Sequence, residues 1–285
     1  MLENRNEEKN MIENIKIEYR KENSAEFEIN AAPNGNPLNY KILNEKIYQI
    51  IKKGYTKVVL NNVCGQRFIG ASLQGQLKIE INGLPGNDLG IFMDGPEIIV
   101  NGNSEDQIGN TMNNGKIIIH GDGGDVIGLS ARGGKIYVKK DVGYRVGIHI
   151  KEFEHKFPVL LIGGTAKDFL GEYMAGGLII VLGLEFKSDG TVSESKYPIC
   201  GEELGTGIHR GKIILRTEED LGSRLGVGAK VYDLKKETEK TIKPYIKEFC
   251  DTFKINPDII NLKPYQIVKP ISKRPFGGNF CGNLI

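Results

Sequence analysis

The sequence predicts a mainly β protein built around a single-stranded, right-handed parallel β-helix of about seven coils. Three observations carry this prediction. The first is that a branched residue followed by glycine recurs about every 19 residues, and the second is that another glycine and a short alternating strand follow most recurrences. The third is the glycine content, 37 of 285 residues, where a usual share of about 7% would give roughly 20. Repeats of this length are too short for propeller blades or helical pairs.

Three regions are expected along the chain, with the β-helix in the middle. They are an N-terminal strand pair and capping helix at 1–56, the repeat region at 57–233, and a C-terminal helix with an extended basic tail at 234–285.

The N-terminal region contains two short strand patterns, at 15–19 and 27–30, and one helical pattern. The stretch 39–54 ends at Gly54, and its apolar residues share one helical face: Leu43, Ile47, Ile50 and Ile51. This helix is expected to cover the open end of the β-helix, where the first coil would otherwise expose strand edges.

The repeats begin at glycines expected to form equivalent corners. The spacings between them are 20, 19, 19, 19, 24 and 34 residues, and the glycines are Gly70, Gly90, Gly109, Gly128, Gly147, Gly171 and Gly205. A corner repeated at one place in every coil requires a positive φ or a close backbone approach, and a Cβ would obstruct both. Because the pattern occurs about seven times between strands, the "GK" at Gly115 is a corner and not a phosphate-binding loop.

The strand after the second glycine alternates between inward and outward positions, as in "GQLKIEING". The outward positions carry an unusual apolar stripe, formed by Ile99, Ile118, Tyr137, Ile180 and Ile214. A contiguous apolar stripe on a soluble protein usually marks an interface. The alternative is that the chain's own terminal helix covers it.

Two long intervals indicate excursions from the rod. They contain "KEFEHKFP" at 151–158 and "EFKSDGTVSESKYP" at 185–198, and both are candidate contact loops. After the coils, a helical pattern presents Ile246, Phe249, Cys250 and Phe253 on one face. The tail that follows is expected to be extended and to lie against the rod or a partner.

Composition excludes several classes of function. The chain has 38 Lys and Arg against 36 Asp and Glu, and the net charge of +2 lacks the strong positive excess that is typical of proteins that bind nucleic acid or a membrane surface. Neither a membrane-spanning run nor a signal peptide is recognisable, so we expect a cytoplasmic protein. The four cysteines are widely spaced, which predicts neither disulfides nor a metal site.

The motifs "CGQRFIG", "PGNDLGIFMDG", "IGNTMNNGKIIIHG", "VGYRVGIHI", "LGEYMAGG" and "GTGIHRG", spread over about residues 64–215, carry a family resemblance. They resemble the GXGXG repeat domain at the C-terminus of the glutamate synthase large subunit. The flanking helix and the "SKRP" tail resemble its stand-alone form in archaea and bacteria. One of the subunits of formylmethanofuran dehydrogenase shares the same repeat and is the alternative.

The resemblance implies a structural subunit without catalytic residues, cofactor or metal of its own. In that family, glutamine hydrolysis and the reductive amination of 2-oxoglutarate occur in other domains. FMN and an iron–sulfur cluster are therefore expected on a partner synthase subunit, with a glutaminase subunit as the second partner. A homo-oligomer stays open. The histidines are scattered and are expected to be surface or turn residues.

One pattern favours an enzyme instead. Asp88, Asp106 and Asp125 stand two or three positions before corner glycines, so stacking would bring them together. Some β-helical hydrolases that act on acidic polysaccharides use neighbouring acids, at about 5 to 9.5 Å in glycoside hydrolysis. The simpler interpretation is that aspartate favours turns through its own backbone hydrogen bonds.

Overall fold

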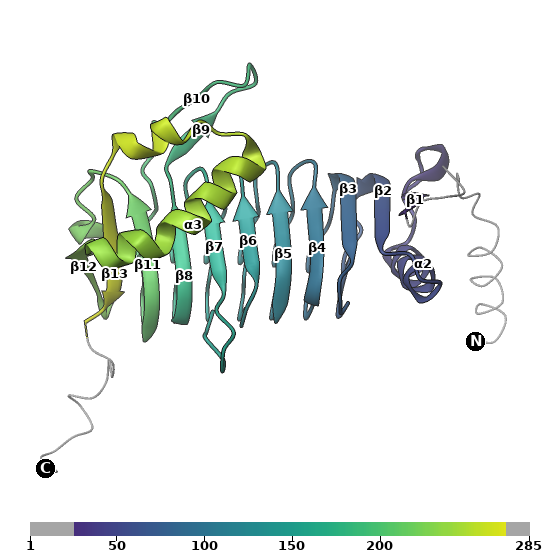
Figure 1. Ribbon diagram of the computed structural model, residues 1–285, viewed down its shortest axis with the longest axis horizontal. Coiled ribbons are helices and arrows are strands. Elements are labelled where there is room, and N and C mark those ends of the chain that lie inside the picture. Colours follow the sequence, from purple (N-terminus) through teal and green to yellow (C-terminus); the bar gives the residue numbers. More distant parts are fainter. Residues whose placement is uncertain (1–25, 272–285) are drawn as a thin grey trace, which may run out of the picture.

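The computed structural model describes residues 26–271, which form a rod of stacked coils (Figure 1). One sheet runs along the rod in the order β1-β2-β3-β4-β5-β6-β7-β8-β11-β13-β12. Neighbouring strands from β1 to β11 are parallel, which confirms the predicted parallel β-helix with helices at its ends. The parallel strands are β1 (Glu26–Asn30), β2 (Lys57–Cys64), β3 (Lys78–Leu84), β4 (Asp94–Val100), β5 (Asn114–Ile119), β6 (Lys135–Val138), β7 (Val159–Ile162), β8 (Ala175–Val181) and β11 (Arg210–Arg216).

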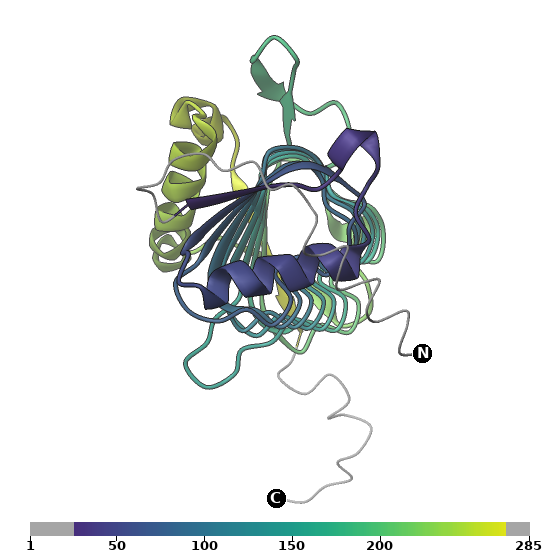
Figure 2. The same ribbon diagram turned by 90° about the vertical axis from the view of Figure 1, so that its right-hand side faces the viewer.

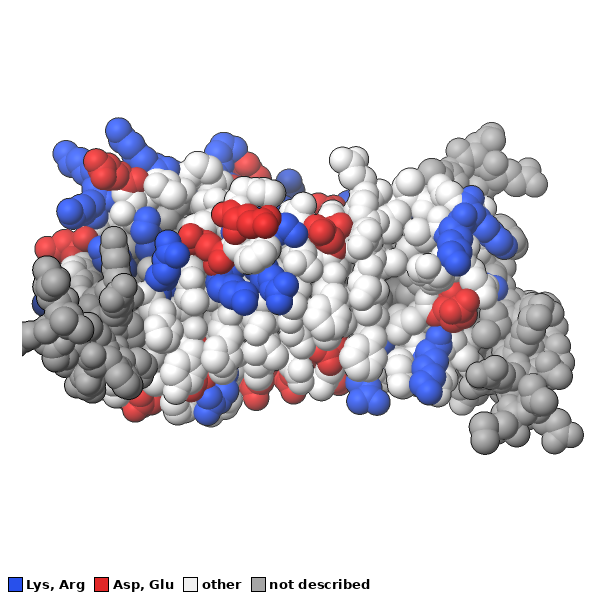
Figure 3. All heavy atoms as spheres, turned by 90° about the horizontal axis from the view of Figure 1, so that it is seen from below, with Lys and Arg blue, Asp and Glu red and all other residues white. Residues whose placement is uncertain are grey.

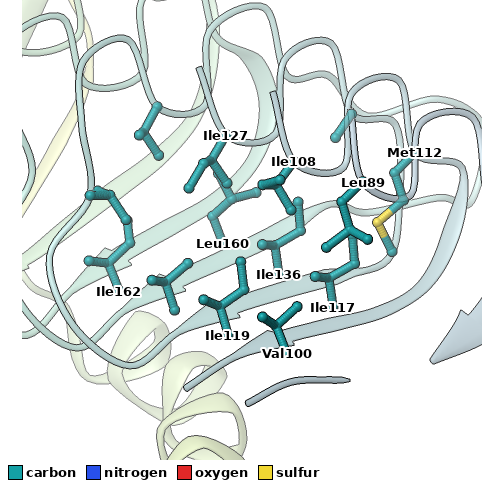
Figure 4. Close-up of a cluster of buried hydrophobic side chains, with 14 of the residues drawn as sticks. Leu89, Val100, Ile108, Met112, Ile117, Ile119, Ile127, Ile136, Leu160 and Ile162 are labelled. Carbon is teal, nitrogen blue, oxygen red and sulfur yellow. The ribbon is translucent and has the colours of Figure 1, made fainter. Parts of the chain in front are cut away.

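The core consists of aliphatic columns, because equivalent residues of successive strands pair in register. Ile117 of β5 pairs with Ile136 of β6, and Ile136 pairs with Leu160 of β7. Figure 4 shows these side chains meeting residues of the opposite wall such as Ile108 and Ile127 inside the rod. Strand β7 lies within the 24-residue interval and restores the register after the first excursion.

The wall opposite the sheet is held by backbone hydrogen bonds that alternate in direction. Asp88, Gly90 and Phe92 all have positive φ, at 61°, 68° and 58°. The Asp88 N–H donates to Asp106 O of the next coil at 3.1 Å, and the Gly90 N–H donates to Ile69 O of the preceding coil at 2.9 Å. Alternating left-handed residues thus let one segment bond to the coils on both sides.

The seven corner glycines occupy the middle of these left-handed segments, with φ between 68° and 74°. They also face the core: a Cβ built on Gly128 would lie 2.8 Å from Leu160 Cδ2. A side chain at this position would therefore meet an unfavourable backbone angle and an occupied core at once.

The N-terminal end is covered by helix α2 (Tyr40–Lys52), which Figure 2 shows crossing the opening of the coils. Asn39 Oδ1 caps its first turn by accepting from the Lys41 N–H at 2.9 Å. Leu43, Ile47 and Ile50 are buried, and Ile51 is half-buried. Residues 27–30 belong to β1, which pairs with β2, and the predicted strand at 15–19 lies outside the described residues.

The C-terminal elements cover the other half of the rod. Helix α3 (Lys236–Phe253) crosses the outer face of the sheet (Figure 1). Part of the expected tail is β13 (Tyr265–Pro270), inserted antiparallel between β11 and β12 (Ala229–Asp233). The remaining elements are a hairpin of β9 (Leu184–Phe186) and β10 (Val192–Glu194), and the 3₁₀ turns η1 (Pro33–Gly35), η2 (Gly222–Arg224) and η3 (Pro257–Leu262).

Candidate functional site

The outward apolar stripe lies beneath α3. Ile118 is 4% exposed, and Tyr137, Ile180 and Ile214 are fully buried, whereas Ile99 remains half-buried at the edge. They pack in one cluster with the buried face of the helix, formed by Ile242, Phe249, Cys250 and Phe253. The partner interpretation of the stripe is thus corrected: the chain covers it with its own C-terminal helix, because a row of large apolar side chains is most stable out of water.

Glu248 fastens α3 to the sheet. Its carboxylate accepts hydrogen bonds from Lys116 at 2.9 Å, from Lys135 at 2.7 Å and from the Tyr137 hydroxyl at 2.9 Å. Burial alone would raise the pKa of Glu248, but these three donors outweigh it and hold the pKa at about 2. Burial, together with the adjacent Glu248 charge, raises the pKa of Tyr137.

We expect Glu248→Gln to lower the free energy of unfolding at neutral pH and to change its acid dependence. The folded-state pKa of about 2 lies below the ordinary 4.5. The contribution of Glu248 is therefore complete above pH 4.5 and is lost as the pH falls towards 2. Denaturant unfolding of both proteins between pH 2 and 7 should show a gap that closes in acid. Glu239→Gln, in an exposed ion pair on the same helix, is the control, and a pH-independent gap would contradict the assignment.

The aspartates before the corners form a hydrogen-bonded ladder. Asp106 Oδ1 accepts from the Asp125 N–H at 2.8 Å, and Asp125 Oδ1 accepts from the Tyr144 N–H at 2.8 Å. Asn87 occupies the equivalent place one coil earlier, with Oδ1 3.3 Å from the Asp106 N. Asp88 belongs to a neighbouring column and accepts from Asn110 Nδ2.

A second ladder runs parallel to the first. Asn103, Asp122 and Asp141 each accept from the backbone N–H of the equivalent residue in the next coil, at 2.9, 3.2 and 2.7 Å. Glycines precede two of the three donor residues, Asp122 and Thr165. A Cβ at Gly121 would run into Asn103 Oδ1, and one at Gly164 into Asp141 Oδ1. The repeated aspartates therefore join coils, which favours the turn interpretation over a catalytic carboxylate pair.

Substitutions at Asp106 should distinguish a structural role, in which the side chain joins two coils, from a catalytic role. Asp106→Asn keeps an acceptor oxygen, so we expect nearly unchanged stability and unchanged activity of any complex that contains the chain. Asp106→Ala removes the acceptor, which should cost about 1 kcal/mol of unfolding free energy. Thermal unfolding and activity measurements on both variants check this. A loss of activity of about a hundredfold in Asp106→Asn, with stability intact, would indicate a catalytic carboxylate.

The second excursion is a hairpin projecting from the rod (Figure 2) and anchored by a buried arginine. The Arg216 side chain is fully buried, and its Nη2 lies 2.5 Å from Glu194 Oε1 on β10. Arg216 also donates to the carbonyls of Leu182, Ile259 and Ile260. Although burial alone would raise the pKa of Glu194, hydrogen bonds from Arg216 and Lys263 lower it below its usual value.

The first excursion loops out between β6 and β7, below the sheet in Figure 1. Phe153 is 49% and Phe157 is 40% exposed. The base of the loop is fixed, because Glu152 Oε1 accepts from the Gly177 N–H at 2.9 Å and Phe153 and Lys156 exchange backbone hydrogen bonds. It thus presents two exposed rings on a structured loop.

The corner columns carry further exposed aromatic side chains that the sequence patterns did not single out. Phe92 and Tyr173 occupy equivalent left-handed positions, and Tyr173 stacks on His149 with ring centroids 5.3 Å apart. Arg145 lies over the Phe169 ring at 4.4 Å and pairs with Glu172. An alignment of the residues that stand two positions after each corner glycine would have found Phe92 and Tyr173 in the sequence. Tyrosine and arginine are enriched in interface hot spots.

Seen from below in Figure 3, acidic and basic side chains gather in one group near the middle of the rod, and the band beside that group is largely uncharged. Within residues 26–271, no group of three or more His, Cys, Asp or Glu could hold a metal ion. In the same part of the chain, no helix is long and apolar enough to span a membrane. Cys200 and Cys250 are buried free thiols and Cys64 is exposed, while Cys281 lies outside the described residues.

Comparison with known proteins places this fold in a family. The model of the GXGXG motif family matches residues 51–269. An uncharacterised protein of Methanocaldococcus jannaschii is 50% identical over 254 residues, covering 87% of this chain and 95% of the relative.

A solved structure shares the fold at lower identity. The formyltransferase/hydrolase complex of Methylorubrum extorquens with methylofuran contains a chain with a TM-score of 0.54 and 17% identity, covering 75% of this chain and 74% of that one. At that identity the similarity shows the fold alone. The family match spans the glycine corners, the parallel strands from β2 to β11 and both excursions, and the chain therefore belongs to the GXGXG motif family.

Proposed function

We propose that this chain is a structural assembly subunit of a split glutamate synthase, in which it holds a glutaminase subunit and an FMN and iron–sulfur synthase subunit together. The observation that carries the proposal is that the repeated aspartates hold neighbouring coils together, which favours a structural role over a catalytic site. The aspartates of both ladders accept backbone N–H groups of the next coil, so the repeat builds a rigid rod. The glutamate synthase context rests on the family resemblance.

The surface of the rod suits a scaffold. The hairpin is pinned at its base by Arg216 and Glu194, and the loop at 151–157 is fixed by Glu152. Contacts made by structured loops require little ordering on binding, which favours affinity. Helix α3 covers the outer face of the sheet from β5 to β11, so over that part of the rod partners are expected at the excursions and the corner positions.

A native pull-down of the chain from its own cells tests the proposal. The eluate should contain a glutaminase-like protein and a second protein whose absorption spectrum shows a flavin and an iron–sulfur cluster. If the chain elutes alone and colourless, the assembly role is wrong. A variant with Phe153→Ser and Phe157→Ser, at two exposed positions, should stay folded and lose partner if the first excursion contributes to the contact.

A second candidate is a structural subunit of formylmethanofuran dehydrogenase. The observation that favours it is the shared fold with a chain of the formyltransferase/hydrolase complex. The same pull-down distinguishes the two, because a molybdenum or tungsten pterin protein in the eluate would replace the glutamate synthase assignment.

A further inference from the structure

A hollow of about 320 Å³ lies where the first excursion, two coils and α3 meet. The coils contribute the residues at the beginning of β5 and β6, the excursion contributes its second half, and α3 contributes one ring. The lining residues are Asn113, Asn114, Gly115, Gly133, Gly134, Lys135, His155, Lys156, Phe157, Val159 and Tyr245.

The polar lining favours an anion. Lys156 and His155 bring basic groups, Asn113 and Asn114 bring amides, and the lining contains neither aspartate nor glutamate. Lys135 also lines the hollow, but its ammonium is bonded to Glu248. Two acids, Glu248 and Asp94, pair with the lysines of the lining. Both oxygens of Glu248 accept hydrogen bonds, and Asp94 lies 3.7 Å from Lys156 Nζ in a partly exposed pair. Such exposed pairs contribute little, so a ligand can compete for the Lys156 ammonium.

The remaining walls favour a carbon chain beside the anionic group. Phe157, which is 40% exposed, forms an apolar wall. The half-buried Tyr245 ring lies beside it in the lining, 5.6 Å from Lys135 Nζ. Inorganic phosphate would meet the ammonium groups but leave these apolar surfaces uncovered, whereas an organic acid would cover both.

The hollow is preformed, because its walls are fixed by the backbone. Gly134 has φ of 78°, and a Cβ at Gly133 would collide with Asn113 O and approach Lys156 Cβ to 3.1 Å. On the excursion, the Lys156 N–H donates to Phe153 O at 2.9 Å. Binding therefore requires little reorganisation of the chain.

From this geometry we propose that the hollow binds a carboxylate attached to a short carbon chain. The ammonium of Lys156 and the imidazole of His155 hold the carboxylate, and the Phe157 and Tyr245 rings contact the carbon chain. The carboxylate comes either from a small organic acid or from an acidic side chain of a partner protein. Binding of a free acid goes beyond the proposed assembly role, while the second source rests on it.

Titration calorimetry on the purified chain tests the free-acid source. Glutarate should bind, and the neutral isostere glutaramide and inorganic phosphate should bind much more weakly. Lys156→Gln should weaken glutarate by about tenfold or more, as expected for loss of a direct charge contact. Lys151→Gln, on the same excursion but outside the lining, is the control and should bind as the parent does.

Partner capture tests the second source with the same variants. If glutarate does not bind, but Lys156→Gln loses a partner that Lys151→Gln retains, the carboxylate belongs to that partner and the proposal stands. If glutarate does not bind and both variants capture the same partners, the proposal is overturned. Phosphate binding as tight as glutarate binding would also overturn it. Because calorimetry uses the isolated chain, its result is independent of whether the assembly role is correct.

Discussion

Gly128→Val is expected to destabilise the chain more than any surface substitution. At φ of 73° a β-branched residue is strained, which costs about 1 to 2 kcal/mol. The new side chain would also enter a core in which even a Cβ lies 2.8 Å from Leu160 Cδ2, and such overpacking adds roughly 1 to 3 kcal/mol. Thermal unfolding of the purified variant should show a melting temperature many degrees below that of the parent.

Gly190→Ala provides the matched control, because Gly190 has φ of 85° with no atom within 4 Å of a built Cβ. This variant measures the free-energy cost of a left-handed backbone at a non-glycine residue, without the added cost of overpacking the core. We expect a loss of about 1 kcal/mol there. If Gly128→Val melted with the parent, the explanation of the repeated glycine as a steric requirement would fail.

Glu194→Ala is the second substitution with a large expected effect. It leaves the fully buried guanidinium of Arg216 without its carboxylate. Because the Glu194 side chain is itself 31% exposed, we expect the low end of the cost of breaking a buried pair, about 3 kcal/mol. The hairpin would also lose its contacts with Arg216 of β11 and with Lys263, which follows η3. Denaturant unfolding measures the cost, and proteolysis within residues 187–191 should become faster.

Two further variants separate the charge effect from hairpin truncation. Glu185→Ala removes a carboxylate from the same hairpin that accepts a long hydrogen bond, 3.4 Å, from the Ser193 hydroxyl, and should change stability little. The pair Arg216→Met with Glu194→Leu replaces the ion pair by apolar side chains and should recover most of the loss. If Glu194→Ala were as stable as Glu185→Ala, the anchoring role of the pair would be wrong.

The parallel coils could be predicted from sequence because each repeat contains the residues that determine its own geometry. A glycine after a branched residue marks the left-handed corner, as at Gly109, and alternating residues such as Ile117 and Ile119 mark the inward face. These are local signals, and they recur. The capping helix α2 could be predicted for the same reason, since its apolar face and terminal glycine lie within one segment.

Most contacts between segments that lie far apart in the chain could not be predicted from the sequence. The apolar stripe and the buried face of α3 were both recognised, and coverage of the stripe by the chain's own helix was one of two alternatives. The structure shows that this alternative is the correct one. Strand β13 is six residues long and has two buried side chains, Ile267 and Val268, so it carries too little pattern to predict its place between β11 and β12. Arg216 was missed because a single charged residue in a strand gives no sign that its partners lie on a hairpin and a 3₁₀ turn.

The aspartates show where residue spacing misleads. Asp88, Asp106 and Asp125 were expected in one column, but Asp88 stands two residues before its glycine and the other two stand three before theirs. In the rod that single-residue difference places Asp88 in the next column. The sequence correctly offered turn chemistry as the alternative, and the ladder of backbone acceptors supports it.

Reconstitution measures most directly whether this chain joins two catalytic subunits. The glutaminase and synthase subunits would be mixed with and without the chain and analysed by size-exclusion chromatography with light scattering. We expect one complex that contains all three proteins and that separates into its catalytic subunits when the chain is omitted. Catalytic subunits that associate equally well without the chain, while the chain elutes separately, would contradict the assembly role.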